Sequence, residues 1–195
     1  MKNPELIETI IYGGAFNPPT LAHLAILQAC VDYAQPRGAE VWVMPSGNRS
    51  DKTINVDNNR RLEYVGAMVE DTEAKGVPIS IVTDELYREV AVETFDTVLE
   101  LNDTYPNREF TWVFGADSTE TMGDWYNGPW LLENLSMLVL ERDGYTINPL
   151  AKRAMALTIP HMNISSTEVR NGLAAGMDVS QLVSPRVNTL VHQTA

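Results

Sequence analysis

The sequence predicts an α/β fold, a doubly wound, Rossmann-like parallel sheet with helices on both faces. Six short runs rich in β-branched and aromatic residues are typical of strands, and stretches with helical spacing of apolar residues lie between them. This alternation indicates a parallel sheet, because a helix usually makes each crossover between parallel strands. The expected strands are residues 8–12, 40–44, 79–83, 110–114, 137–140 and 156–159, and the expected helices are residues 21–33, 59–70 and 94–102.

The pattern within each run supports its assignment. The strand runs are apolar through their length, as a sheet covered on both faces requires. The helix at residues 59–70 has one apolar side, formed by Leu62, Val65, Met68 and Val69. Two more helices are expected near the end of the chain, where Ser165, Ser166 and Thr167 supply capping hydroxyls and Ser184-Pro185 forms a second helix start.

A single domain spanning residues 1–195 is expected, with a C-terminal helical segment at residues 165–195 packed on it. The chain has 195 residues, of which 44% are apolar, and this is enough for one sizeable core. The polar stretches at residues 45–59 and 143–149 are typical of loops within a domain. The first is long and follows a strand, so it is a candidate substrate loop, because ligands bind beyond the carboxyl ends of such strands.

The composition argues against several classes of protein. A formal net charge of -12 disfavours binding to a nucleic acid polymer or an anionic membrane. Cys30 is the only cysteine, which excludes an intrachain disulfide and a cysteine-based zinc cluster, and we expect it to be buried in a helix. No apolar run approaches the roughly 20 residues of a membrane span. We expect a cytoplasmic protein, and the sequence leaves open whether it forms a homo-oligomer.

The strongest local signal is the segment GGAFNPPTLAH, which runs from Gly13 to His23 between the first expected strand and the first expected helix. Glycines let backbone N–H groups approach a phosphate, and a helix start carries partial positive charge. Thr20 and His23 are three residues apart, so they share one face of the helix start and could reach the same anion. The segment matches neither the Walker A pattern nor the dinucleotide-binding glycine pattern. It therefore predicts a different kind of phosphate site.

This segment resembles the (T/H)-x-G-H signature of the nucleotidyltransferase superfamily, and its first residues resemble the nicotinate (nicotinamide) mononucleotide adenylyltransferase branch. Residues 114–118 (FGADS) with residues 125–126 (WY), residues 164–170 (ISSTEVR) and residues 182–185 (LVSP) resemble further motifs of that branch, in its order. The resemblance implies a nucleotidyltransferase-type fold. It also implies an enzyme of NAD biosynthesis that joins nicotinate mononucleotide to the AMP moiety of ATP and releases pyrophosphate.

The resemblance also implies roles for individual residues. The catalytic residues would be Thr20, His23 and Arg170, with His23 donating a hydrogen bond to the α-phosphate of ATP. The residues implied in ATP binding are Gly13, Gly14, Ala15, Phe16, Thr20, His23, Gly115, Asp117, Ile164, Ser165, Ser166 and Arg170. Those implied in binding the pyridine mononucleotide are Asn17, Lys52, Thr94, Trp125 and Tyr126. Mg²⁺ is expected to arrive with ATP, and no protein metal ligands are expected.

Some residues depart from the family pattern. Ala22 stands where the signature has glycine, and residues 45–52 and 91–94 differ from the usual substrate-loop elements. These departures leave the acceptor open, with nicotinamide mononucleotide and another phosphorylated acceptor such as phosphopantetheine as alternatives. A catalytically silent nucleotide-binding protein is a third alternative.

Several side chains are expected to have structural or surface roles only. We expect Arg60 and Arg61 to lie at an exposed helix start. The tryptophans assigned to core packing are Trp42, Trp112 and Trp130.

Overall fold

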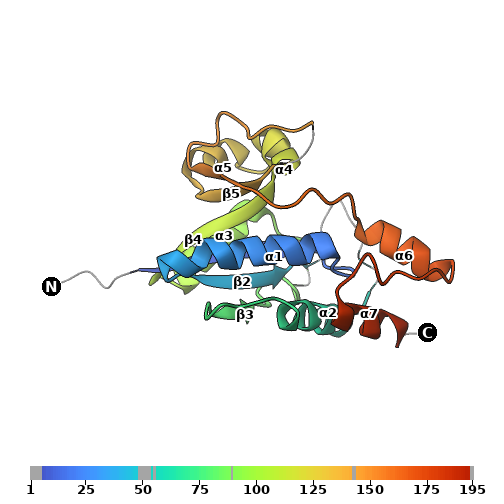
Figure 1. Ribbon diagram of the computed structural model, residues 1–195. Helices are drawn as coiled ribbons and strands as arrows, with labels where there is room; N and C mark the ends of the chain where they lie inside the picture. The colour runs from blue at the N-terminus through green and yellow to red at the C-terminus, as the bar shows by residue number, and fades with distance from the viewer. Residues whose placement is uncertain (1–5, 48–53, 55, 89, 142–143, 194–195) are drawn as a thin grey trace.

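A computed structural model describes residues 6–47, 54, 56–88, 90–141 and 144–193 of the chain. Six parallel strands form one sheet in the order β3-β2-β1-β4-β5-β6 (Figure 1). The strands are β1 (Ile7–Gly14), β2 (Glu40–Pro45), β3 (Ile79–Ile81), β4 (Arg108–Gly115), β5 (Met137–Leu140) and β6 (Ala154–Leu157). The order in which strands are added reverses between β1 and β4, because β2 and β3 lie on one side of β1, and β4, β5 and β6 lie on the other. The segments that follow these two strands therefore diverge at the carboxyl edge of the sheet, where such folds bind ligands.

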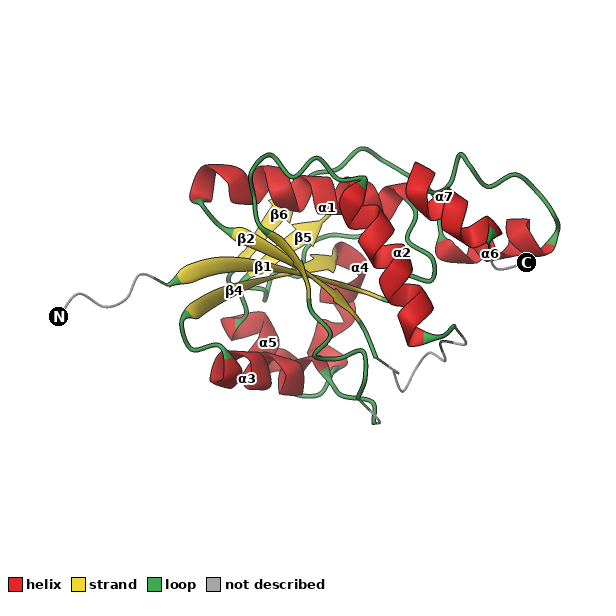
Figure 2. Ribbon diagram, turned by 90° about the horizontal axis from the view of Figure 1, so that it is seen from below, coloured by secondary structure: helices red, strands yellow, loops and turns green. Residues whose placement is uncertain are grey.

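Helices cover both faces of the sheet (Figure 2). One face carries α1 (Leu21–Ala34), α2 (Asn58–Glu70), α6 (Ser166–Ala174) and α7 (Pro185–His192). The other face carries α3 (Thr94–Thr104), α4 (Ala116–Thr121) and α5 (Gly128–Asn134). Short 3₁₀ turns, η1 (Gln35–Arg37) and η2 (Met122–Asp124), follow α1 and α4. The predicted doubly wound α/β fold is confirmed.

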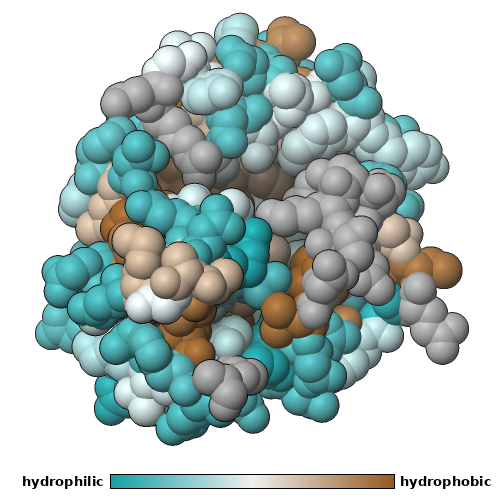
Figure 3. Space-filling model, turned by 90° about the vertical axis from the view of Figure 1, so that its right-hand side faces the viewer, coloured by the Kyte–Doolittle hydropathy of each residue, from teal (hydrophilic) through white to brown (hydrophobic). Residues whose placement is uncertain are grey.

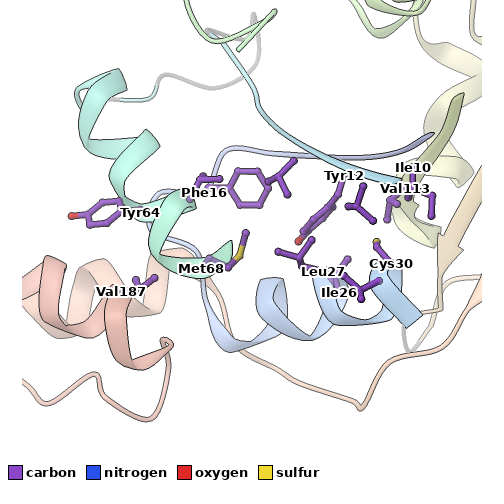
Figure 4. Packing of buried hydrophobic residues seen from close by; sticks show 14 of the residues in the cluster. Ile10, Tyr12, Phe16, Ile26, Leu27, Cys30, Tyr64, Met68, Val113 and Val187 are labelled. Atoms are coloured by element: carbon purple, nitrogen blue, oxygen red, sulfur yellow. The ribbon is translucent and has the colours of Figure 1, made fainter. Parts of the chain in front are cut away.

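The sheet separates two apolar cores, and β1 contributes to both because successive strand residues point to opposite faces. Ile10 and Tyr12 pack on the α1 side, and Ile11 packs on the α3 side. Figure 4 shows the α1-side core, where Cys30 lies among buried apolar side chains. Burial raises the pKa of the Cys30 thiol to about 12, so the thiol is neutral and a poor nucleophile. The expected buried position of Cys30 is confirmed.

The C-terminal segment contacts the face that carries α1 and α2. The Leu21 N–H donates to the Leu182 carbonyl over 2.9 Å, and Arg186 at the start of α7 forms an ion pair with Asp71 at the end of α2. These contacts place α6 and α7 beside the carboxyl edge of the sheet (Figure 1). That residues 1–195 form a single domain stays a prediction. Within the described part of the chain, no helix has the length and apolar character needed to cross a membrane.

The structure corrects three details of the sequence-based assignment. The sixth strand is β6 (Ala154–Leu157), two residues earlier than expected, and β3 ends at Ile81. Both are edge strands with exposed side chains, so they are not apolar and covered through their length. Trp42 and Trp112 are buried as expected, but Trp130 is 41% exposed, because it lies on the outer side of α5 against Phe95.

A polar cluster joins three strands at the amino edge of the sheet, opposite the carboxyl edge. Arg108 of β4 forms an ion pair with Glu40 of β2 and donates to the Thr9 hydroxyl of β1 over 3.0 Å. The Arg108 guanidinium also lies 4.5 Å from the centre of the Trp42 ring. Burial lowers the pKa of Arg108, and the hydrogen bonds from the guanidinium to these partners offset its removal from water.

We expect Glu40→Gln to lower the free energy of unfolding by about 2 kcal/mol, because it leaves a largely buried guanidinium without its carboxylate. Urea denaturation measures the change. Glu109→Gln is the matched control, since its partner Arg153 is 3.6 Å away and both side chains are more than half exposed. An equal decrease in the free energy of unfolding of the two variants would show that burial of the Arg108–Glu40 pair does not increase its contribution to stability.

Candidate active site

The expected site motifs meet at the carboxyl edge of the sheet, where β1 and β4 end. Residues 15–20 follow β1, α4 follows β4, and α6 lies against the first of these segments. Figure 3 views the molecule onto this edge, where the surface is hollowed near its centre.

His23 is held by the residue that caps its own helix. The Thr20 N–H donates to His23 Nδ1 over 3.0 Å, and the Thr20 hydroxyl oxygen lies 2.8 Å from the same nitrogen. Because a backbone N–H can only donate, Nδ1 accepts, and the neutral imidazole carries its hydrogen on Nε2. His23 therefore presents an Nε2–H donor of fixed orientation, which suits a phosphate oxygen.

Thr20 is the N-cap residue of α1, one of the two roles that its position suggested. It is 1% exposed, and its hydroxyl is directed at His23. In this structure Thr20 orients His23. That Thr20 also contacts a bound phosphate stays a prediction.

The Phe16 side chain is buried beneath the segment that joins β1 to α1. Its backbone has a positive φ of 46°, and its ring is fully buried near Tyr12 (Figure 4). The ring packs edge-on to Tyr12, with 5.4 Å between ring centres, and to His23, with 5.5 Å. A Cβ atom on Gly14 would lie only 2.9 Å from the tip of this ring, whereas one on Gly13 would lie 3.8 Å from the nearest atom, the Met44 carbonyl oxygen. Glycine is therefore required at position 14 because a larger residue would overlap the Phe16 ring. The interpretation of Gly14 as a phosphate-binding glycine did not include this packing requirement.

The first and last motifs of the chain are joined by side-chain hydrogen bonds to backbone carbonyls. Arg170 Nη1 donates to the Asn17 carbonyl over 2.8 Å, and the Ser166 hydroxyl donates to the Pro18 carbonyl over 2.8 Å. Arg170 Nη2 donates to the Thr167 hydroxyl over 3.0 Å. Ser165 is the N-cap of α6, as expected, and its hydroxyl accepts from the Glu168 N–H. Other guanidinium N–H groups of Arg170 are available to bind phosphate oxygens.

The remaining residues expected in ATP binding lie close to these two motifs. Gly115 ends β4 and is the N-cap of α4, and half-buried Asp117 lies in the first turn of that helix. Ile164 is also half-buried and directly precedes Ser165. The Ala15 carbonyl is turned toward α2, where it accepts a hydrogen bond from Arg61.

The aromatic residues expected to bind the acceptor lie on the other side of the sheet. Half-buried Trp125 packs edge-on to Phe114 of β4 at 6.1 Å. Tyr126 is 57% exposed and contacts Phe95 at 5.8 Å. Thr94 directly precedes Phe95 at the start of α3. It therefore lies on the helix that the Tyr126 ring contacts. Lys52 lies outside the described residues.

Comparisons with known proteins identify the family of the chain. Residues 11–172 match the cytidylyltransferase-like family model. A probable nicotinate-nucleotide adenylyltransferase of Exiguobacterium sibiricum is 32% identical over 94% of this chain and 95% of that protein. A probable nicotinate-nucleotide adenylyltransferase of Bacillus cytotoxicus is 31% identical over 94% of each chain. The chain belongs to the nicotinate-nucleotide adenylyltransferase family.

A solved structure supports the fold of this adenylyltransferase family member. Plasmodium falciparum nicotinic acid mononucleotide adenylyltransferase, complexed with NaAD, matches with a TM-score of 0.81 and 22% identity. The match covers 96% of this chain and 95% of that one. The family resemblance stated from the sequence motifs is confirmed.

Arg61 is the site-proximal residue of this adenylyltransferase that sequence reasoning misplaced. It is 1% exposed, and its guanidinium donates to the Ala15 carbonyl over 2.9 Å and to the Ser46 carbonyl over 2.5 Å. The expected exposed helix start is therefore wrong for Arg61, and Arg60 is half-buried. The signal was present in the sequence, because Arg61 precedes Val65 by four residues and Met68 by seven and so lies on the apolar stripe of α2.

We expect Gly14→Ala to destabilise the protein by about 1–3 kcal/mol, because the new methyl group would overlap the buried Phe16 ring. Thermal and urea unfolding measure the change. Gly13→Ala, one residue earlier in the same strand, is the control, and we expect it to be neutral or slightly stabilising. Equal stability of the two variants would contradict the packing role of Gly14.

Proposed function

We propose that this chain transfers the AMP moiety of ATP to nicotinate mononucleotide, giving deamido-NAD and pyrophosphate in NAD biosynthesis. The observation that carries the proposal is the contact of Arg170 with the Asn17 carbonyl, which joins the two family motifs beside His23. The probable nicotinate-nucleotide adenylyltransferase of Exiguobacterium sibiricum matches across both motifs, since the alignment spans 94% of this chain.

The reaction is an in-line displacement at phosphorus. A phosphate oxygen of the mononucleotide attacks the α-phosphorus of ATP, and the bond from that phosphorus to the bridging oxygen of pyrophosphate breaks. No protein nucleophile is required, so the enzyme acts by positioning the two nucleotides and neutralising charge. His23 Nε2–H donates to a non-bridging α-phosphate oxygen, where charge develops in the transition state. Arg170 binds the β- and γ-phosphates and stabilises the departing pyrophosphate.

Mg²⁺ belongs to this proposal as a companion of ATP. The described residues contain no group of three or more His, Cys, Asp or Glu side chains that could hold a metal ion. Mg²⁺ prefers phosphate and water oxygens, so we expect triphosphate oxygens and water to be its main ligands. When bound, Mg²⁺ supplies further neutralisation of phosphate charge.

The proposal that the acceptor is a pyridine mononucleotide depends on an aromatic side chain that can stack on its ring. Trp125 is only half-buried, and its contact with Phe114 is edge-on, an arrangement that could leave a ring face for stacking. Stacking of a base on an aromatic side chain contributes about 1–3 kcal/mol in nucleic-acid systems. Thr94 and the exposed Tyr126 lie on neighbouring elements and could contact the same acceptor.

The deciding experiment incubates the purified protein with Mg-ATP and, separately, nicotinate mononucleotide, nicotinamide mononucleotide or phosphopantetheine. Pyrophosphate release gives the rate, and mass spectrometry identifies the product. We expect deamido-NAD to form fastest. Turnover only with another acceptor would overturn the substrate. Thermal stabilisation by ATP without turnover of any acceptor would indicate a silent nucleotide-binding protein.

We expect His23→Ala to lower kcat about 100-fold or more, with little change in ATP affinity, because the lost hydrogen bond forms chiefly with charge developed in the transition state. Steady-state kinetics and ATP titration measure the two quantities. His192→Ala, an exposed histidine of α7 bonded to the Asn188 carbonyl, is the control. Equal losses of turnover and ATP affinity would show that His23 supports ground-state binding instead.

A further inference from the structure

Arg61 and Asn58, one turn apart on α2, bind the segments that follow three neighbouring strands. Arg61 donates to the Ala15 carbonyl after β1 and to the Ser46 carbonyl after β2, over 2.9 and 2.5 Å. Its third contact is to the Asn58 side-chain oxygen at 3.4 Å, and the Asn58 amide donates to the Leu86 carbonyl after β3 over 2.9 Å. The pair therefore fixes the relative positions of three segments at the carboxyl edge.

The segments after β2 and β3 are also in direct contact with each other. A Cβ atom on Gly47 would lie 2.2 Å from the Glu85 carbonyl oxygen, so only glycine allows this approach of the two backbones. The Glu85 carboxylate accepts from the Thr97 hydroxyl over 2.7 Å. Because Thr97 lies in the first turn of α3, this contact connects the Arg61 cluster to the start of that helix, where Thr94 lies.

The partners of Arg61 are unusual for a buried cation. Its contacts among the described residues are with two backbone carbonyls and one amide oxygen, and no described carboxylate lies within ion-pair distance. Burial lowers the pKa of Arg61. A planar guanidinium can reach three separate oxygens in fixed directions, which the single ammonium group of lysine cannot reproduce.

We propose that Arg61 is a positioning residue for the acceptor half of the active site, an inference that rests on the proposed function. Of the segments it joins, the one after β3 is connected through the Glu85–Thr97 contact to the start of α3, where Thr94, a residue assigned to the acceptor, lies. The first segment carries Ala15, which is assigned to ATP, but Arg170 and Ser166 also bind this segment, so it keeps two attachments when Arg61 is replaced. Loss of the Arg61 contacts therefore weakens acceptor binding more than ATP binding.

The test compares Arg61→Lys, which keeps the charge, with Asn58→Ala and with the control Arg37→Lys. Arg37 is an exposed arginine at the far end of α1 that donates to the Tyr33 carbonyl. Steady-state kinetics give kcat and a separate KM for nicotinate mononucleotide and for ATP. Hydrogen–deuterium exchange follows residues 15–17, 46–47 and 84–88, with β5 as the internal reference.

For Arg61→Lys we expect the KM for nicotinate mononucleotide to rise about tenfold or more, with the KM for ATP changed less than about threefold. Exchange should become faster in the three segments while β5 keeps its protection. Asn58→Ala should speed exchange mainly at residues 84–88, and it keeps the proposal testable if Arg61→Lys does not fold. Arg37→Lys should change none of these quantities.

Two results would overturn the proposal. Unchanged KM values and exchange in Arg61→Lys would show that a positive charge alone is sufficient at this position. A lower kcat with both KM values unchanged, together with faster exchange throughout the protein, would indicate a role in overall stability only. If the unmodified protein turned over no pyridine mononucleotide, the proposed function would fail, and the exchange data would still decide whether Arg61 holds the three segments.

Discussion

The connection between β1 and α1 is held by side chains from distant parts of the chain, which bind its backbone carbonyls. Arg61 binds the Ala15 carbonyl, Arg170 binds the Asn17 carbonyl, and Ser166 binds the Pro18 carbonyl. Without hydrogen bonds, carbonyls removed from water would destabilise this turn. The same contacts attach α2 and α6 to the loop. The position of α6, and therefore of Arg170 itself, depends on this short connection.

The start of α1 is used differently from most anion-binding helix starts. In such sites the first N–H groups of the helix bind the anion directly. Here the Leu21 N–H donates to the Leu182 carbonyl, and the Thr20 N–H donates to His23 Nδ1. In the proposed function, side-chain donors, His23 Nε2–H and the Arg170 guanidinium, bind the phosphates instead of these two N–H groups. The first N–H groups serve to attach the C-terminal segment and to fix the histidine tautomer.

Sequence patterns predicted the elements of this fold well, because burial imposes a period on side chains that pack against a sheet. They predicted less well where the partner of a side chain is remote in the chain. Gly14 looked like a phosphate-binding glycine, and only the structure shows the Phe16 ring beside it. Arg61 looked like a surface charge, since carbonyl partners leave no sequence signature. Trp130 looked like a core residue, although an aromatic residue on a short helix can face outward over Phe95.

Two arginines at the carboxyl edge of this acidic chain, Arg61 and Arg170, have no carboxylate among their described hydrogen-bond partners. Away from the site, Arg88, Arg108 and Arg186 form ion pairs with carboxylates. Among the described residues, Arg61 and Arg170 instead bind carbonyl, amide and hydroxyl oxygens, which leave their positive charge uncancelled. Because the protein interior has a low dielectric constant, the electrostatic attraction of such a charge for an anion extends over several ångströms. Binding two anionic nucleotides in a protein of net charge -12 requires such local positive charge, and neutral partners can hold a cation in place without removing it.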